Sequence, residues 1–318
     1  MNKTVLAIVI PSYNEEESLP KAFSVLNDII NDLVEKDLID SKSYIYVVDD
    51  GSTDKSWDLI SEAHNNNPER IKGVKFTKNF GNQSSIIAGL ESVRELGCDA
   101  AITIDADLQQ DETKIIEFVQ KFQEGNDIVA GIRKDRNTDD FIKKSTSTLF
   151  YKTMNFLGSH LVPNHSEYRL VSKRALDVLA KYNETNLFLR GLFFEFGLKT
   201  AYVYFDVKKR EHGVSKFNLI SLMRLAVYGI VAFSTRPLRF VFFTGFIISA
   251  LAMCFGLFAL AQIIFHGHGL KYLTAFEIFI TFILGLQILC IGIIGEYIGQ
   301  MFQEVKARPR YIKDIELK

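Results

Sequence analysis

Over the first two thirds of the chain, short apolar runs alternate with longer segments in which apolar residues recur at helical spacing. The apolar runs have the length of strands and cover residues 5–10, 44–48, 74–77, 100–104 and 128–131. The segments with helical spacing between them cover residues 17–35, 55–65, 83–96 and 112–124. Strands without a polar face need cover on both sides, which a parallel sheet with connecting helices provides. The pattern therefore predicts an α/β domain over residues 1–215, with a mostly parallel sheet and flanking helices.

Toward the C-terminus the pattern changes to two long apolar runs. Residues 240–265 carry no charged side chain, and residues 273–294 carry one, Glu277. A helix of the first length reaches roughly 39 Å, which exceeds the ~30 Å hydrocarbon core of a bilayer. We therefore predict two transmembrane helices, joined as a hairpin, within residues 238–299. The alternative is a hairpin buried in a soluble core, which would be unusually long for a segment with so little charge.

Basic residues flank this pair of helices at its outer ends. Those before the pair include Lys208, Lys209, Arg210, Lys216, Arg224, Arg236 and Arg239, and those after it are Lys306, Arg308, Arg310 and Lys313. The loop between the helices carries only Lys271. The positive-inside rule then predicts a multi-pass protein of the plasma (inner) membrane, with residues 1–215 and a basic tail, residues 300–318, in the cytoplasm. Residues 216–237 have mixed polarity and predict amphipathic interfacial helices, with an ordinary packed helix as the alternative.

Composition and charge argue against several classes of protein. The net charge of −1 gives no basic field for a nucleic-acid partner. The three cysteines have no paired spacing, which argues against a disulfide framework or a zinc site. The glycine-rich phosphate loops of ATPases and of dinucleotide-dependent oxidoreductases are absent. The first apolar run lacks the basic lead and the cleavage site of a signal peptide, so none is predicted.

Polar clusters follow three of the predicted strands, at residues 11–16, 49–54 and 105–109. Ligands of open α/β sheets bind at the carboxyl ends of the strands, where these clusters fall. The carboxylates of Asp49 and Asp50 can accept hydrogen bonds from a nucleobase or a ribose. The same sequence is also ordinary for a turn that caps a helix, so the second cluster alone decides nothing.

The third cluster contains two acids, Asp105 and Asp107, separated by one residue. At a strand end they can direct oxygens at one divalent cation, Mg²⁺ or Mn²⁺, which commonly bridges protein carboxylates and substrate phosphates. A solvated acidic turn is the alternative for such a pair in isolation. Because the other clusters are expected at neighbouring strand ends, the combination predicts a site for a nucleoside diphosphate.

Taken in order, the motifs resemble those of the family 2 glycosyltransferases of GT-A fold. The matching stretches are residues 9–16 (VIPSYNEE), 47–54 (VVDDGSTD), 78–81 (KNFG) and 104–109 (IDADLQ). Later stretches resemble the polyprenyl-phosphate (bactoprenol) glucosyltransferase branch, which is similar to dolichol-phosphate mannose synthases. These are residues 186–191 (NLFLRG), 210–216 (REHGVSK), 233–239 (FSTRPLR), 295–299 (GEYIG) and 304–311 (EVKARPRY). The resemblance covers nearly the whole chain.

The resemblance implies roles for particular residues. Binding of the nucleotide-sugar falls to Pro11, Tyr13, Glu15, Asp49, Asp50, Asp105 and Ala106, and binding of the divalent cation to Asp105, Asp107 and Gln109. Catalytic roles fall to Asp107, Glu167 and Arg133, and contacts with the diphosphate or the acceptor phosphate to Arg169, Arg190, Arg210 and Lys216. For Arg133, Arg210 and Lys216 the alternative is a surface cation that faces anionic lipid.

The chain departs from the family pattern at two places. Glu167 stands where the branch usually has the Asp of an Asp-Phe-Arg-Leu stretch, so the acid is kept on a side chain that is one methylene longer. Residues 110–112 (QDE) stand where the family often has Asp-Pro-Pro, which bears on a helix start more than on the metal site.

The resemblance implies transfer of a single sugar to undecaprenyl phosphate with inversion, which gives a lipid-linked sugar for modification of a surface polysaccharide. UDP-glucose is the expected donor, and GDP-mannose, a UDP-N-acetylhexosamine or a modified pentose donor stays open, as does a homo-oligomeric state. A processive polysaccharide synthase would carry a Gln-x-x-Arg-Trp motif, and the only tryptophan here is Trp57, before the acidic pair. A membrane protein that binds nucleotide-sugars without catalysis is the alternative from another class.

Overall fold

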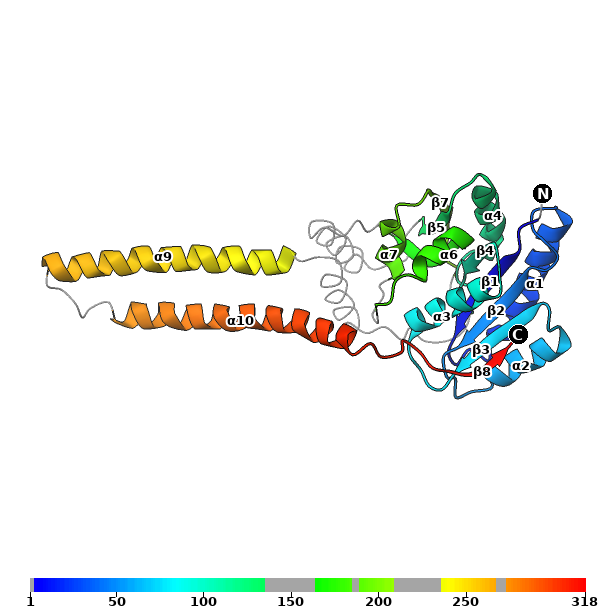
Figure 1. Cartoon of the computed structure of the whole chain (residues 1–318), viewed down its shortest axis with the longest axis horizontal. Helices are drawn as coiled ribbons and strands as arrows, with labels where there is room; N and C mark the ends of the chain where they lie inside the picture. Colours follow the sequence, from blue (N-terminus) through cyan, green and yellow to red (C-terminus); the bar gives the residue numbers. More distant parts are fainter. Residues whose placement is uncertain (1–2, 135–163, 185–188, 209–235, 267–272) are drawn as a thin grey trace. The chain divides into compact units, whose positions relative to one another are not determined.

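The computed structural model describes residues 3–134, 164–184, 189–208, 236–266 and 273–318 (Figure 1). They fall into two compact units, one built around a sheet and one that contains two long helices. Of the predicted site residues, Arg210 and Lys216 lie outside the described residues, and so do almost all of the predicted interfacial helices.

The first unit contains an eight-stranded sheet in the order β7-β5-β6-β4-β1-β2-β3-β8. The strands are β1 Leu6–Ser12, β2 Tyr44–Asp49, β3 Ile71–Phe76, β4 Ala100–Thr103, β5 Ile128–Arg133, β6 His165–Ser172, β7 Thr200–Phe205 and β8 Lys313–Leu317. Parallel pairs join β4 to β1, β1 to β2, β2 to β3, and β5 to β7. Strand β6 runs antiparallel to β4 and β5, and β8 runs antiparallel to β3. The prediction of a mostly parallel α/β sheet is confirmed.

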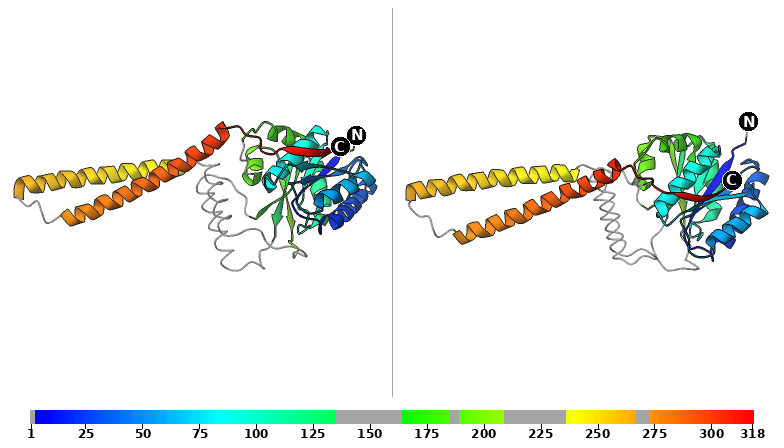
Figure 2. Two further views of the ribbon diagram at one scale, coloured as in Figure 1. Left: turned by 90° about the horizontal axis from the view of Figure 1, so that it is seen from below. Right: turned by 60° about the horizontal axis from the view of Figure 1, so that its bottom comes forward.

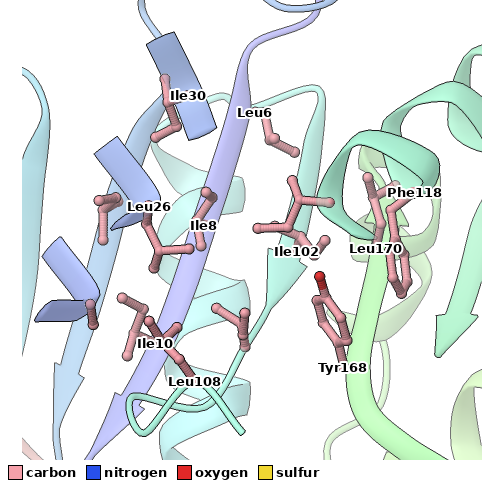
Figure 3. Packing of buried hydrophobic residues seen from close by; sticks show 14 of the residues in the cluster. Leu6, Ile8, Ile10, Leu26, Ile30, Ile102, Leu108, Phe118, Tyr168 and Leu170 are labelled. Carbon is pink, nitrogen blue, oxygen red and sulfur yellow. The ribbon is translucent and has the colours of Figure 1, made fainter. Parts of the chain in front are cut away.

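Helices cover both faces of this sheet. They are α1 Leu19–Glu35, α2 Ser56–Asn66, α3 Asn82–Glu95, the 3-10 turn η1 Glu112–Lys114, α4 Ile115–Gln123, α6 Lys173–Leu179 and α7 Leu189–Glu195. Alternate residues of β1 enter two different cores, because successive side chains of a strand point to opposite faces. Ile8 and Ile10 pack with Leu26 of α1 (Figure 3), whereas Ala7 and Val9 belong to the core on the α3 side.

Helix α3 packs unusually close to β1. A Cβ atom at Gly89 would lie only 2.3 Å from Cγ1 of Val9, so the helix can approach the strand here because the residue is glycine. The first turn of α3 is thereby fixed near the carboxyl ends of β1 and β2. This is the edge of the sheet at which the polar clusters fall.

The last strand of the sheet, β8, comes from the C-terminal segment, for which the sequence analysis predicted only a basic tail. The Tyr311 ring stacks on the Phe76 ring with a centroid separation of 5.1 Å, and its hydroxyl donates to Glu91. Arg310 donates to Glu91 at 3.1 Å and to the carbonyl of Glu184 at 2.8 Å. Three elements that are distant in sequence thus hold the end of the chain against the sheet.

The second unit contains helices α9, Arg236–His266, and α10, Leu273–Val305, which contact each other and run antiparallel (Figures 1 and 2). Large apolar side chains such as Phe242, Leu257 and Ile288 are exposed. Among the described residues, Phe282–Val305 is long and apolar enough to cross a membrane, with a mean hydropathy of 1.9. The described part of α9 contributes a shorter apolar segment, Leu238–Ile248.

We expect Arg310→Ala to destabilise the sheet unit, because Glu91 and the carbonyls of Tyr182 and Glu184 lose a largely buried partner. Loss of hydrogen bonds to a charged group costs about 1–3 kcal/mol, which lowers the unfolding midpoint by several degrees. The measurement is thermal unfolding of the full chain in detergent. Arg308→Ala, at an exposed position of the same segment, is the control. Equal midpoints for the two variants would contradict this role of Arg310.

Candidate active site

The three polar clusters meet at one edge of the sheet, because β4, β1 and β2 are adjacent and parallel. Ser12 and Asp49, the last residues of β1 and β2, are register partners. Strand β5 runs in the same direction as β4, since both are antiparallel to β6, so Arg133 at its end lies at the same edge. The structure therefore brings together side chains that the sequence separates by more than a hundred residues.

Hydrogen bonds tie the first cluster to the second. The amide of Asn14, which has a left-handed φ of 53°, donates to Ser52 Oγ at 2.9 Å, and the amide of Thr53 donates to Asn14 Oδ1 at 2.9 Å. The amide of Glu15 donates to Ser56 Oγ at 2.9 Å, and the Glu15 carboxylate accepts from Ser18 Oγ at 3.0 Å. The two loops thus form one wall of the site.

Within this wall, Pro11 is buried in the end of β1, and Tyr13 and Glu15 are half-buried. The hydrogen bonds described above fix the backbone of this loop, and therefore the positions from which Tyr13 and Glu15 extend. The predicted nucleotide-binding residues of the first cluster therefore share one surface with those of the second.

Asp50 uses both carboxylate oxygens to hold the loop that precedes α3. Oδ1 accepts from the amide of Phe80 at 2.6 Å, and Oδ2 accepts from the amide of Gly81 at 2.8 Å. Gly51 packs directly on this loop, because a Cβ atom there would lie 2.4 Å from the carbonyl carbon of Lys78. Burial raises the pKa of Asp50, and the two amides oppose that shift. Asp50 therefore anchors the start of α3 in addition to lining the site.

Asp49 is fully buried, and burial raises the pKa of its carboxyl group. One oxygen accepts from the amide of Ser52 at 3.2 Å. Its other oxygen, Oδ1, and the hydroxyl of Ser12 are buried without a hydrogen-bond partner in the described part of the chain. Buried polar atoms without partners are costly, so these two neighbouring strand ends carry unused hydrogen-bonding capacity.

The acidic pair lies on a segment whose residues alternate in burial. Asp105, Asp107 and Gln109 are half-buried, whereas the residues between and after them are buried. The predicted metal ligands therefore share the open side of this segment. Ala106 was predicted to bind the nucleotide, but its side chain packs in the hydrophobic core, so only its backbone is available for that role.

A buried glutamine, Gln110, fixes the first acid. Its Oε1 accepts from the amide of Asp105 at 3.0 Å, and its Nε2 donates to Asp105 Oδ2 at 2.6 Å. The backbone carbonyl of Gln109 accepts from the amide of Lys208 at 2.8 Å, which ties the segment to the chain after β7. Gln110 was not predicted from the sequence, where its only signal is its place on the buried side of the alternation.

The donor set fits a hard divalent cation. The described residues contain no group of three or more His, Cys, Asp or Glu side chains that could hold a metal ion. Asp105 and Asp107 supply two carboxylates, however, and Gln109 supplies an amide oxygen. Mg²⁺ is usually held by one or two carboxylates, with water and substrate phosphates completing its shell.

Strand β6 carries the predicted acceptor-side residues. Its pairing with β4 ends where Thr103 meets Arg169, and the Thr103 hydroxyl donates to the backbone carbonyl of Glu167, so Glu167 lies beside the end of β4. Glu167 and Arg169 form an ion pair at 2.7 Å, with side-chain exposures of 8% and 1%. Cζ of the Arg169 guanidinium lies 4.5 Å from the centroid of the Phe193 ring. The contact of Arg169 with a phosphate stays a prediction; in the structure its guanidinium is buried and paired with Glu167. Arg190 lies in α7.

Comparison with known proteins identifies the family. Residues 7–179 match the model described as "Glycosyl transferase family 2". The glycosyltransferase YkoT of Bacillus subtilis is 42% identical over 99% of this chain and 93% of its own. The bactoprenol glucosyl transferase of Shigella phage SfX is 32% identical over 96% of this chain and 98% of its own. A prophage bactoprenol glucosyl transferase homolog of Escherichia coli K12 is 32% identical over 96% and 97%.

The chain therefore belongs to family 2 of the glycosyltransferases. It is a glycosyltransferase, with proteins named bactoprenol glucosyl transferase among its relatives over nearly its full length. The family and the enzyme class predicted from the motifs are confirmed. The roles of individual side chains stay predictions.

We expect Asp49→Asn to raise the thermal stability of the protein at neutral pH. Burial raises the pKa of Asp49 above its ordinary value of 3.8, so the folded protein binds this proton more tightly than the unfolded chain. Stability is then lost as the pH rises from that value through the raised pKa. The advantage of Asp49→Asn over the wild type should accordingly shrink as the pH falls toward 4. Unfolding midpoints at several pH values measure it, with exposed Asp58→Asn as the control. A constant difference across that range would contradict this assignment.

Proposed function

We propose that this glycosyltransferase transfers one sugar, glucose in the first instance, from a nucleotide-sugar to undecaprenyl phosphate at a membrane surface. The observation that carries this proposal is the extent of the likeness to proteins named bactoprenol glucosyl transferase. It spans 96% of the chain, and so includes the apolar helices as well as the catalytic sheet. The product would be a lipid-linked sugar that serves modification of a surface polysaccharide.

The donor would bind along the carboxyl ends of β1 and β2. The buried atoms without partners, Ser12 Oγ and Asp49 Oδ1, support a polar ligand there, and a nucleoside offers both donors and acceptors. Tyr13 and Glu15 would line the same pocket from the first loop, with Asp50 on the other side. These contacts leave the identity of the sugar open, so GDP-mannose, a UDP-N-acetylhexosamine and modified pentose donors are alternatives.

A divalent cation, Mg²⁺ or Mn²⁺, would be held by Asp105, Asp107 and Gln109. When bound, it would neutralise charge on the departing nucleoside diphosphate. Gln110 supports this assignment, because its two hydrogen bonds orient the Asp105 carboxylate before any ligand arrives.

The acceptor phosphate needs little activation. The second pKa of a phosphate monoester is about 6, so the attacking oxygen is largely anionic at neutral pH. Catalysis would then rest on positioning and on stabilisation of the leaving group. Glu167 would orient the acceptor side, and Arg133, Arg190, Arg210 and Lys216 would contact phosphates. The buried guanidinium of Arg169 would support Glu167. We propose a single displacement with inversion at the anomeric carbon.

The membrane anchor would consist of α9 and α10. Strand β8 follows α9 and α10 in the sequence and pairs with β3. The chain therefore belongs to the same sheet before and after the two helices. Any crossing of a bilayer between those points must therefore occur an even number of times. One crossing by each helix, within residues 240–265 and 273–294, would satisfy this condition, and the basic flanks favour a sheet on the cytoplasmic side. Residues 216–237 would lie in the interface.

We expect purified protein with undecaprenyl phosphate and Mg²⁺ or Mn²⁺ to yield a lipid that gains a single hexose from UDP-glucose. Mass spectrometry of the lipid across a panel of nucleotide-sugars identifies the donor. Asp107→Ala should abolish turnover, whereas Glu167→Gln should retain a measurable fraction. Glu62→Ala, at an exposed site, is the control. A growing polymer, or no glycolipid with any donor, would contradict the proposed function.

We expect both ends of the helical unit to lie on the same side of the membrane. In a variant without native cysteines, a cysteine within residues 267–272 should react with an impermeant maleimide added outside intact cells. A cysteine added after Lys318 should react only once the membrane is opened. Labelling of the two sites under the same conditions would rule out the hairpin.

A further inference from the structure

Gln83, in the first turn of α3, uses both ends of its amide. Its Nε2 donates to Glu167 Oε1 at 3.1 Å, and its Oε1 accepts from the backbone amide of Leu189 at 3.1 Å. Both partners require this orientation, because a carboxylate only accepts and a backbone N–H only donates. The side chain is half-buried between α3, β6 and α7. None of the family motifs singled out in the sequence contains Gln83.

Two further bonds close a ring through Glu167. Arg169 donates from Nη2 to Glu167 Oε2 at 2.7 Å and from Nη1 to the carbonyl of Leu189 at 2.9 Å. Gln83, Glu167, Arg169 and the backbone of Leu189 are therefore linked in a closed circuit. Each oxygen of Glu167 accepts a hydrogen bond from a different donor, which fixes the plane of the carboxylate.

The ring lies directly after the loop that Asp50 holds. The amides of Phe80 and Gly81 bind the two oxygens of Asp50, and α3 begins at the next residue. Phe80 and Gly81 thus bind Asp50, on the donor side, through their backbone amides. Two residues further on, Gln83 binds Glu167, on the acceptor side, through its side chain. The orientation of Glu167 depends on a segment that the donor side of the site holds in place.

We propose that Gln83 is a positioning residue that holds the Glu167 carboxylate in its orientation toward the acceptor and links it to the loop held by Asp50. This inference rests on the proposed acceptor-side function of Glu167. Gln83 contacts no reacting atom in this scheme and acts through Glu167. The competing account is that Gln83 merely stabilises the fold by satisfying the amide of Leu189.

The two accounts differ in how substitutions at positions 83 and 167 combine. If Gln83 acts through Glu167, Gln83→Met should lower kcat roughly 10- to 100-fold in the wild type, as misplaced catalytic groups do, and should add little in the Glu167→Gln background. KM for the nucleotide-sugar should change less than about twofold, because uniform donor binding is untouched. A purely structural role predicts the same loss in both backgrounds.

A second variant guards against simple misfolding. Gln83→Glu keeps an oxygen for the amide of Leu189 but places a second carboxylate beside Glu167. Its unfolding midpoint should fall, and the double variant Gln83→Glu/Glu167→Gln should recover part of that loss. Amide and carboxylate have then exchanged places, but Arg169 keeps only an amide oxygen as its partner at position 167. The kcat of the double variant should stay at or below that of Glu167→Gln, since the carboxylate is no longer at position 167.

The matched control is Gln123→Glu, the same change at an exposed glutamine whose amide binds the carbonyl of Leu38. Kinetics in detergent with UDP-glucose and undecaprenyl phosphate, together with thermal unfolding, give all the quantities. Equal kcat losses from Gln83→Met in both backgrounds, or wild-type kcat in the double variant, would overturn the positioning role. Inactivity of the wild-type protein itself would instead count against the proposed function.

Discussion

A parallel sheet that is buried on both faces leaves little room for polar chemistry except at the ends of its strands. In this protein that constraint places the acids after β1, β2 and β4 at one edge. The carboxylates at this edge are only partly exposed, so hydrogen bonds from specific donors compensate for the water that they lose. Backbone amides serve Asp50, a glutamine serves Asp105, and a glutamine with an arginine serves Glu167.

The two glutamines solve the same problem in the same way. Gln110 and Gln83 each accept a backbone N–H with the amide oxygen and donate to a carboxylate with the amide nitrogen. Each therefore sets the direction of an acid by reference to the backbone. Gln110 is a neutral amide and adds no charge beside Asp105, whereas Glu167 is also paired with the Arg169 guanidinium.

The sequence predicted much of this arrangement, because the evidence for it is local. Apolar runs followed by acidic turns identify β1, β2 and β4 and the clusters at their ends. Gln83 and Gln110 could not be recognised, since their importance comes from partners that the fold supplies. The burial of Arg169 could not be predicted either, because a charged residue favours an exposed position, whereas every residue of β6 is buried.

Strand β8 was not predicted either, because it depends on a partner strand that the fold supplies. Its position also has a consequence for biosynthesis. Its five residues are mostly charged and become a strand only by pairing with β3, which precedes it by more than two hundred residues. The ribosome synthesises β8 after both long helices. The side of β3 that pairs with β8 therefore stays unpaired until then, and an unpaired strand edge can associate with other chains. Completion of the sheet must therefore wait until both long helices have been synthesised, so the last step of its folding follows the synthesis of the helical unit.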